Sequence, residues 1–533
     1  MTRYGYWIAL LILVAAPYTT GLRHEFVYDD HGSIVENPFL DDRDCLKKLL
    51  RFQTITDASV PDGRRPVVVL SYLLDRAVWG LRPAGFHATN LLLHLGVVLL
   101  LAALARRLQP ELGPFPGFAA ALLYGLHPVL TEAVQCPAFR EDLLVTLFLL
   151  LSLLAATRAR TAWLSVPALI AALASKESAA VTPILMLWMW FCFPATRLPR
   201  KLATTAAAVT ATPVIVFAVL WLNSGPLQAS SSEHAAMALA YPANLMTVPW
   251  LWLKQVLLLL VPHPLIVDHV IMSVTQFTDW RFLSGAAAVV ACGVLAMALP
   301  RRAPWIAFGV GWMLISFVPV SNIVPLHNPF AERYVYLTAV GFCLLAARLL
   351  SLTPERETAC GSAQPGAKTC IHRRALLLAL ICMTCTGLTV RRLADWADDS
   401  TLWSRTLQQE PRSARAHTWM GLGCKRAGDF DKALQHFMEA DRLNPLEVSG
   451  LINIAVLHGQ QGRFAEAEAL LREAIRRRPD KPDAHWNLAV ALDALGRKDE
   501  AMAEVQQTLR LDPRYPAAVT LMTQPAPESE SNP

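Results

Sequence analysis

The chain has 533 residues, of which 54% are hydrophobic and 17% charged, and its formal net charge is +6. This composition excludes an ordinary soluble globular protein, and the basic residues lie between apolar runs, where they indicate membrane topology rather than nucleic-acid binding. The ten cysteines form no cluster with zinc-ligand spacing, so no metal site is predicted from them. Arg outnumbers Lys 38 to 10, which favours a GC-rich bacterial genome.

The first predicted element is an apolar run at residues 6–20 that follows a basic start at Arg3. Its length also allows a cleaved signal peptide. We interpret it as an uncleaved anchor, because two adjacent acids, Asp29 and Asp30, follow within ten residues of its end. The first outer loop is then predicted at residues 23–85.

Apolar runs continue to about residue 391 and predict an all-α, multi-span membrane domain at residues 1–392. Basic clusters between the runs should face the cytoplasm. That rule predicts eleven spans if the Pro-flanked run at 246–262 is re-entrant on the outer side, and it leaves Arg391 and Arg392 on the wrong side. The candidate spans after the first are 86–105, 117–134, 140–157, 161–175, 178–194, 202–222, 282–299, 304–320, 333–350 and 375–391.

From residue 414 the sequence repeats with a period of 34 residues, at 414–447, 448–481 and 482–515. A glycine column, Gly428, Gly462 and Gly496, recurs at this period, together with alanine and proline columns. This pattern is typical of tetratricopeptide repeats, which stack as pairs of antiparallel helices. We expect a helical linker at 393–413 and a disordered tail at 516–533.

Polar residues gather at the predicted outer ends of the spans. Carboxylates, cations and imidazole at one membrane face suit a reaction on a lipid-linked phosphate, where cations neutralise the leaving group and a carboxylate deprotonates an acceptor. Each residue alone also fits a helix cap, a hairpin ion pair or an interfacial anchor. The residues are Asp29, Asp30, His127, Glu132, Arg140, Asp142, Lys176, Glu177, Glu332, Arg333 and Tyr334.

Several segments in this order resemble the transmembrane and tetratricopeptide-repeat O-mannosyltransferase family of the glycosyltransferase C superfamily. The segments are Phe26-Val27-Tyr28-Asp29-Asp30, Asn37-Pro38, Arg65-Pro66, Phe86-His87, His127-Pro128, Thr131-Glu132-Ala133, Ser175-Lys176-Glu177 and Ala331-Glu332-Arg333-Tyr334. The resemblance covers almost the whole chain. Before Arg140 the sequence reads Cys136-Pro137-Ala138-Phe139, where the family suggests a Gly-containing turn.

The resemblance implies an inverting enzyme that uses a polyprenyl- or dolichyl-phosphate sugar, with Asp29 or Asp30 as the base. It also implies Arg140, Lys176 and Arg333 as ligands of the donor phosphate, and Glu332 as the residue that orients Arg333. The lipid-phosphate sugar is a substrate, no cofactor is required, and a divalent metal is possible. The enzyme would be an integral protein of a bacterial inner membrane, or of the endoplasmic reticulum membrane in a eukaryote, with the repeats on the outer or lumenal side.

The repeats are expected to bind the protein acceptor, with Asn453 and Asn487 hydrogen-bonding its backbone; these two residues could instead cap or bridge neighbouring repeats. A chain ending at about residue 410 should then keep transfer to a small acceptor. Two other functions remain open: a non-enzymatic membrane scaffold, and a lipid-linked glycan polymerase or ligase. An acid pair directly after the first span favours the transferase over both.

Overall fold

The computed structural model describes residues 3–51, 53–55, 60–108, 110–199, 210–215, 243–326, 328–351, 365–513 and 515–523. Over these residues the fold is helical and contains no strand, which confirms the predicted all-α class. The helices before the repeats are α1 (Arg3–Tyr18), α2 (Cys45–Leu50), α3 (Pro66–Trp79), α4 (Pro83–Leu108), α5 (Phe115–Gly125), α6 (Thr131–Gln135), α7 (Arg140–Ala155), α8 (Ser165–Leu173), α9 (Thr182–Cys192), α12 (Ala243–Leu260), α13 (Trp280–Ala298), α14 (Pro304–Phe317), α15 (Val335–Ser351), α16 (Pro365–Asp395) and α17 (Asp399–Gln409).

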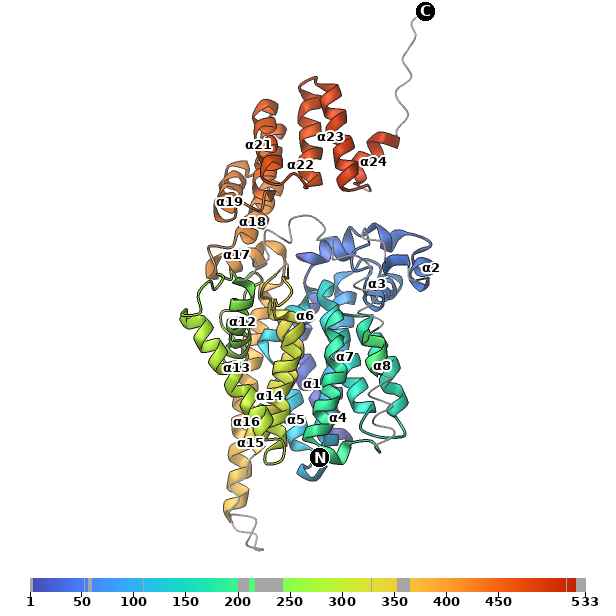
Figure 1. Ribbon diagram of the computed structural model, residues 1–533, viewed down its shortest axis with the longest axis vertical. Helices are drawn as coiled ribbons and strands as arrows, with labels where there is room; N and C mark the ends of the chain where they lie inside the picture. The colour runs from blue at the N-terminus through green and yellow to red at the C-terminus, as the bar shows by residue number, and fades with distance from the viewer. Residues whose placement is uncertain are drawn as a thin grey trace, which may run out of the picture.

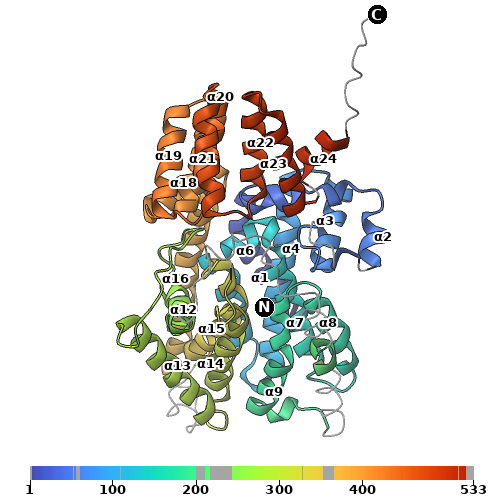
Figure 2. The same ribbon diagram turned by 45° about the horizontal axis from the view of Figure 1, so that its top comes forward.

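The membrane domain is a bundle with the repeat array stacked on one end, which we call the repeat-facing end (Figure 1). Helices α12–α16 form one side of the bundle and α7–α9 the other, with α1 and α6 between them (Figure 2). The chain begins at the end away from the repeats, and α16 runs the length of the bundle to reach α17 (Figure 1). Helices α2 and α3, from the predicted first outer loop, lie at the repeat-facing end beside the array.

Six helices in the described residues are long and apolar enough to cross a membrane, and the bent pair Phe115–Gly125 and Pro128–Gln135 makes a seventh if it is one span. Three shorter apolar helices, Ala162–Leu173, Glu177–Cys192 and Pro304–Val320, add to the bundle. These helices make the chain a multi-pass membrane protein. Ala243–Leu260, predicted to be re-entrant, meets the length and composition of a span. Most of the predicted span at 202–222 lies outside the described residues.

Two glycines, Gly309 of α14 and Gly341 of α15, bring these helices into close contact. A Cβ atom added to Gly341 would lie 2.6 Å from the carbonyl oxygen of Gly309, so neither position has room for a side chain. Small residues at helix crossings allow such an approach in membranes. The crossing fixes α15 against the bundle, and Glu332 and Arg333 lie just before its first residue.

The array consists of three antiparallel helix pairs and a terminal helix. The helices are α18 (Ala414–Arg426), α19 (Phe430–Leu443), α20 (Ser449–Gln460), α21 (Phe464–Arg477), α22 (Pro482–Ala494), α23 (Lys498–Leu511) and α24 (Pro516–Thr523). Gly428, Gly462 and Gly496 connect the helices of each pair with φ values of 79°, 76° and 81°, a left-handed conformation that favours glycine. The expected disordered tail is wrong for residues 516–523, because α24 covers them and Ala518 packs against Ala489 and Val505.

Candidate active site

The two acids of the first loop have different surroundings, and this separates their roles. Asp30 is fully buried: its Oδ1 accepts from the backbone N–H of Ala138 at 2.7 Å and its Oδ2 from that of Val27 at 3.1 Å. The thiol of Cys136 donates to the same carboxylate at 3.3 Å. Burial raises the pKa of Asp30 to about 7, although these hydrogen bonds lower it. Asp30 therefore holds the loop against the turn before α7.

Asp29 is half-buried, and across the described residues its carboxylate accepts no hydrogen bond and forms no direct ion pair with the protein. Burial raises its pKa above the ordinary value, while the guanidinium groups of Arg333 and Arg415 lower it and Glu141 raises it. An acid with free lone pairs can accept a proton, whereas Asp30 has used both oxygens. This environment favours Asp29 over Asp30 as a base.

Tyr28 adopts a left-handed conformation, with φ of 56°, directly before Asp29. A non-glycine residue in this region costs of order 1–3 kcal/mol, and such strain persists only where surrounding contacts hold it. The holding contacts come from α17, the helix before the array: the backbone N–H of Tyr28 donates to Asp399 at 2.9 Å, and its ring packs edge-on against Trp403. Residues remote in sequence thus fix the turn that presents Asp29.

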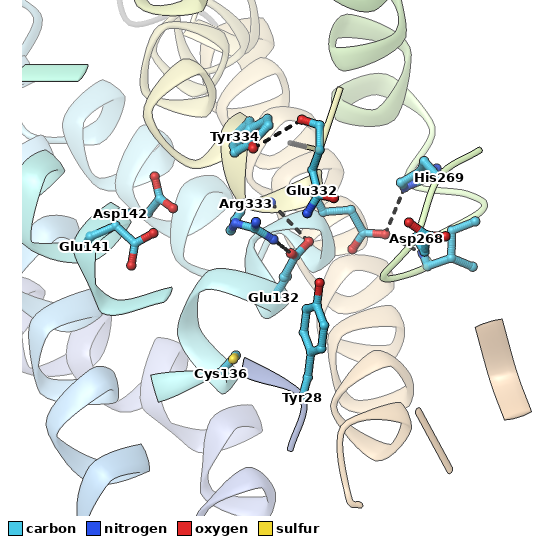
Figure 3. Close-up of polar contacts among 12 residues, drawn as sticks. Tyr28, Glu132, Cys136, Glu141, Asp142, Asp268, His269, Glu332, Arg333 and Tyr334 are labelled. Atoms are coloured by element: carbon cyan, nitrogen blue, oxygen red, sulfur yellow. Dashed lines mark hydrogen bonds and ion pairs between the residues drawn. The ribbon is translucent and has the colours of Figure 1, made fainter. Parts of the chain in front are cut away.

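Arg333 lies at the start of α15 and pairs with Glu132 of α6. Its Nη1 donates to Glu132 at 2.6 Å, its backbone N–H donates to the same carboxylate at 3.2 Å, and its guanidinium lies 3.9 Å from the centre of the Phe139 ring. Figure 3 shows the pair with the hydroxyl of Tyr28 directed toward it. In the described structure, its other two guanidinium nitrogens donate to no protein oxygen. They remain available to an anion.

Glu332 does not orient Arg333, which corrects the role implied by the family resemblance. Its fully buried carboxylate accepts from the backbone N–H of Ile266 and from Arg392 at 3.2 Å, and lies 3.4 Å from His269 (Figure 3). Glu132 takes the orienting position instead. The contact also explains why Arg392 departs from the charge rule for cytoplasmic loops: it is a buried partner of Glu332 rather than a loop residue.

A second charged cluster surrounds Lys176, between α8 and α9. Its ammonium group donates to Asp142 at 2.6 Å and lies 3.6 Å from Glu141. Glu177 pairs instead with Arg65, with an Nη2–Oε1 distance of 3.0 Å. One oxygen of Glu141 and one of Asp142 are buried with no hydrogen-bond partner. Lys176 is therefore close to carboxylates on one side and to the ring of Tyr334 on the other, 5.7 Å from its centre.

Arg140 and His127, both predicted at this site, form hydrogen bonds to neighbouring protein groups that support the fold. The guanidinium of Arg140 is fully buried and donates to Asp75 at 2.5 Å, Asn90 at 2.7 Å and Ser71 at 3.2 Å. The Nε2–H of His127 donates to the carbonyl of Leu259 at 2.9 Å, and its Nδ1 accepts from the backbone N–H of Val129 at 3.4 Å. Because every guanidinium nitrogen of Arg140 has a protein acceptor, its expected role as a phosphate ligand does not fit this arrangement.

The repeat asparagines make contacts within their own helices. The side-chain amide of Asn453 donates to the carbonyl of Ser449 at 2.9 Å, and that of Asn487 to Asp483 at 2.7 Å. Asn487 also lines a hollow of about 250 Å³ between α20, α21 and α22, beside Val456, Phe464 and Val490. Their carbonyl oxygens are not used in these two bonds, so they can still accept from a peptide.

Three site residues were absent from the sequence prediction: Asp268, His269 and Arg415. Asp268 and His269 follow α12 in an irregular segment, and Arg415 belongs to α18. The only signal for this region was the misplaced charge of Arg392. Arginine is common on the surface of all three repeats, so nothing distinguished Arg415. Within the described part of the chain, no group of three or more His, Cys, Asp or Glu could hold a metal ion.

A tetratricopeptide-repeat family model matches residues 452–516. Over 506 residues the chain is 24% identical to the protein O-mannosyl-transferase TMTC3 of Mus musculus, covering 86% of this chain and 53% of the relative. It is 26% identical over 454 residues to the protein O-mannosyl-transferase F38B6.6 of Caenorhabditis elegans, covering 82% and 63%. Its homologues are protein O-mannosyl-transferases.

The chain spans about half to two thirds of the length of these relatives. They are animal proteins, so the bacterial source favoured by the Arg content is not supported. Solved structures similar to the chain cover about a quarter of it. MamA, at 24% identity, covers 26% of this chain and 78% of its own with a TM-score of 0.19. YrrB, a tetratricopeptide-repeat protein, is 16% identical and covers 28% and 80% with a TM-score of 0.22.

Proposed function

We propose that the protein is an inverting membrane glycosyltransferase. It moves a mannose-like sugar from a polyprenyl- or dolichyl-phosphate donor to a Ser or Thr hydroxyl of a protein. The carrying observation is Asp29, a carboxylate without a hydrogen-bond donor in the described protein, whose pKa the guanidinium groups of Arg333 and Arg415 lower against the effect of burial. The homology to protein O-mannosyl-transferases supports the sugar and acceptor classes.

In the proposed reaction, the Asp29 carboxylate takes the proton of the acceptor hydroxyl. The acceptor oxygen bonds to the anomeric carbon from the side opposite the lipid phosphate, and the bond from that carbon to the phosphate oxygen breaks. The lipid phosphate leaves with the electron pair, and the two guanidinium nitrogens of Arg333 that have no protein acceptor stabilise its negative charge by hydrogen bonds. Glu132 keeps Arg333 in place, and Lys176 adds positive charge from the neighbouring cluster.

The positive-inside rule supports a membrane orientation for this proposal. Arg106 and Arg107 end α4, and Arg107 donates to Thr157, which is followed by Arg158 and Arg160. These basic residues lie at the far end of helices that begin near the repeats, on the side where the chain starts (Figure 1). We place that end in the cytoplasm and the site and array on the outer or lumenal side. The array would bind the acceptor protein there.

The test is transfer by the full chain in lipid vesicles that contain a polyprenyl-phosphate mannose with labelled sugar. A Ser/Thr-rich peptide is supplied as acceptor, and the products are analysed by mass spectrometry and by the anomeric configuration of the new bond. We expect labelled hexose on Ser or Thr with inverted configuration. No label on the peptide with any polyprenyl-phosphate hexose, in vesicles where the protein is folded, would contradict the proposal and favour the scaffold function.

A further inference from the structure

The first helix of the repeat array reaches the site through Arg415. Its guanidinium donates to the Tyr28 hydroxyl at 3.2 Å and to the side-chain oxygen of Asn328 at 2.7 Å, and it pairs with Asp268 at 3.2 Å. The Arg415 side chain is 11% exposed, in contrast to the surface arginines of the later helices. It therefore contacts the loop of the base, the chain before α15 and the segment after α12 at once.

Helix α18, together with α17 before it, also packs against the loop that carries Asp29. The indole rings of Trp403 and Trp419 stack 5.6 Å apart and nearly parallel, and Tyr28 packs edge-on against both. Asp399 accepts from the backbone N–H of Tyr28 and pairs with His31 at 2.9 Å. These contacts join α17 and α18 to the turn before Asp29. Within its own loop the turn is closed by backbone hydrogen bonds, from the N–H of Asp30 to the carbonyl of Val27 at 3.1 Å and from that of His31 to the carbonyl of Tyr28 at 3.3 Å.

The charges that interact with Asp29 come from five segments, and one of them is Asp62, in the segment before α3. Arg333 stands at the start of α15, Arg415 on α18 and Glu141 on α7, and Asp30 is its neighbour on the loop. Arg333 is paired with Glu132, and Arg415 with Asp268. Two cations that already have other partners thus offset part of the cost of burying the Asp29 anion, and Asp29 keeps its own oxygens free.

We propose that Arg415 is a positioning residue of the transfer site, so that the first tetratricopeptide helix completes the site rather than only presenting an acceptor. Through Tyr28, Arg415 fixes the turn that carries Asp29, and its charge favours the ionised base. Docking of the array on the membrane domain then becomes a condition for chemistry. This inference rests on the proposed function and adds to it a residue from the array.

The test is the pH profile of sugar transfer to a small acceptor by the full chain. Asp29 must be ionised to act, and Arg415 lowers its pKa, so removing the positive charge raises that pKa. In Arg415→Gln we expect the acid limb to move up by about one pH unit, which below the limb is about a tenfold loss. Arg415→Lys, which keeps the charge, should return the limb toward its wild-type position.

Two further variants separate electrostatics from folding. Asp268→Asn removes the negative partner of Arg415, which leaves more of the positive charge to favour ionised Asp29. The acid limb of this variant should therefore move to lower pH, opposite to the shift in Arg415→Gln. Arg412→Gln is the matched control, because Arg412 pairs with Glu410 and its side chain is 57% exposed. Its profile should match wild type.

An unmoved limb in Arg415→Gln overturns the inference, as does a loss at every pH that Lys does not restore. Absence of transfer in the wild type, or full transfer in Asp29→Asn, counts against the proposed function instead. The inference and the proposed function therefore fail by different results.

Discussion

Ion pairs at the repeat-facing end of the membrane domain and ion pairs in the array have similar lengths but opposite surroundings. Arg333 and Glu132 are 2.6 Å apart and join residues 201 positions apart, with side chains 10% and 0% exposed. Arg442 and Glu439 are 2.5 Å apart within one helical turn, with side chains 69% and 34% exposed. Distance alone therefore does not distinguish the two kinds of pair.

The difference lies in desolvation. Charges buried in a membrane bundle lose their hydration and persist only where paired or used, whereas an exposed pair within a helix contributes little and is screened by salt. The buried pairs include Arg333 with Glu132 and Arg415 with Asp268. Each joins segments that lie far apart in the sequence, so short-range sequence patterns do not indicate the pairing. We therefore expect substitutions at the buried pairs to lower both stability and transfer, and substitutions at the exposed pairs of the array to change neither measurably.

Truncation should have the largest effect. A chain ending at residue 410 loses Ser413, Arg415 and Trp419, so we expect it to lose transfer even to a small acceptor. This reverses the expectation from the sequence, which treated the repeats as separable from chemistry. A chain ending at residue 481 keeps α18 and should retain that transfer. Wild-type rates from the shorter chain, measured at equal protein, would show that the array is dispensable for chemistry.

Glu132→Gln tests the buried pair. It leaves the charge of Arg333 without its partner, and breaking one member of a buried pair costs roughly 3–5 kcal/mol. Thermal unfolding in detergent should show this loss. Adding Arg333→Met to Glu132→Gln removes the unpaired charge and should recover much of the stability. Transfer should be absent in this double variant, because the guanidinium that meets the lipid phosphate is gone. Recovery of both together would mean that the pair serves only the fold.

Asp30→Asn should act mainly on stability. The amide places an N–H₂ group against one of the two backbone donors, Ala138 or Val27, and an unsatisfied buried donor costs about 1–3 kcal/mol. We expect a lower melting temperature and a smaller loss of transfer than for substitution of Asp29. A loss of transfer at unchanged stability would move the base to Asp30.

Glu439→Gln is the expected smallest effect. Its pair with Arg442 is local and exposed, so the melting temperature and the transfer rate should both stay within experimental error. A clear drop in the melting temperature or in the transfer rate would mean that exposed ion pairs in the array contribute to stability or to transfer.

Sequence patterns predicted the parts of the fold that depend on local periodicity. The 34-residue period indicated the three helix pairs, and the glycine column coincides with the left-handed connections. The acid pair and the residues around Arg333 were recognised as candidates. The pairings were not predictable, because Glu132 and Glu332 are equally acidic and only the three-dimensional arrangement assigns Arg333 to one and Arg392 to the other. Arg415 was missed for the same reason: its role depends on how the array docks.

The most direct test of the account is the rate of sugar transfer by Asp29→Asn, measured beside its melting temperature. The substitution keeps the shape of the side chain and removes its basicity, and Asp29 has no hydrogen bond within the described protein to lose. We predict an unchanged melting temperature and a transfer rate lower by a factor of about 100 to 10,000. A rate near that of the wild type at equal protein would contradict the assignment of Asp29 as the base.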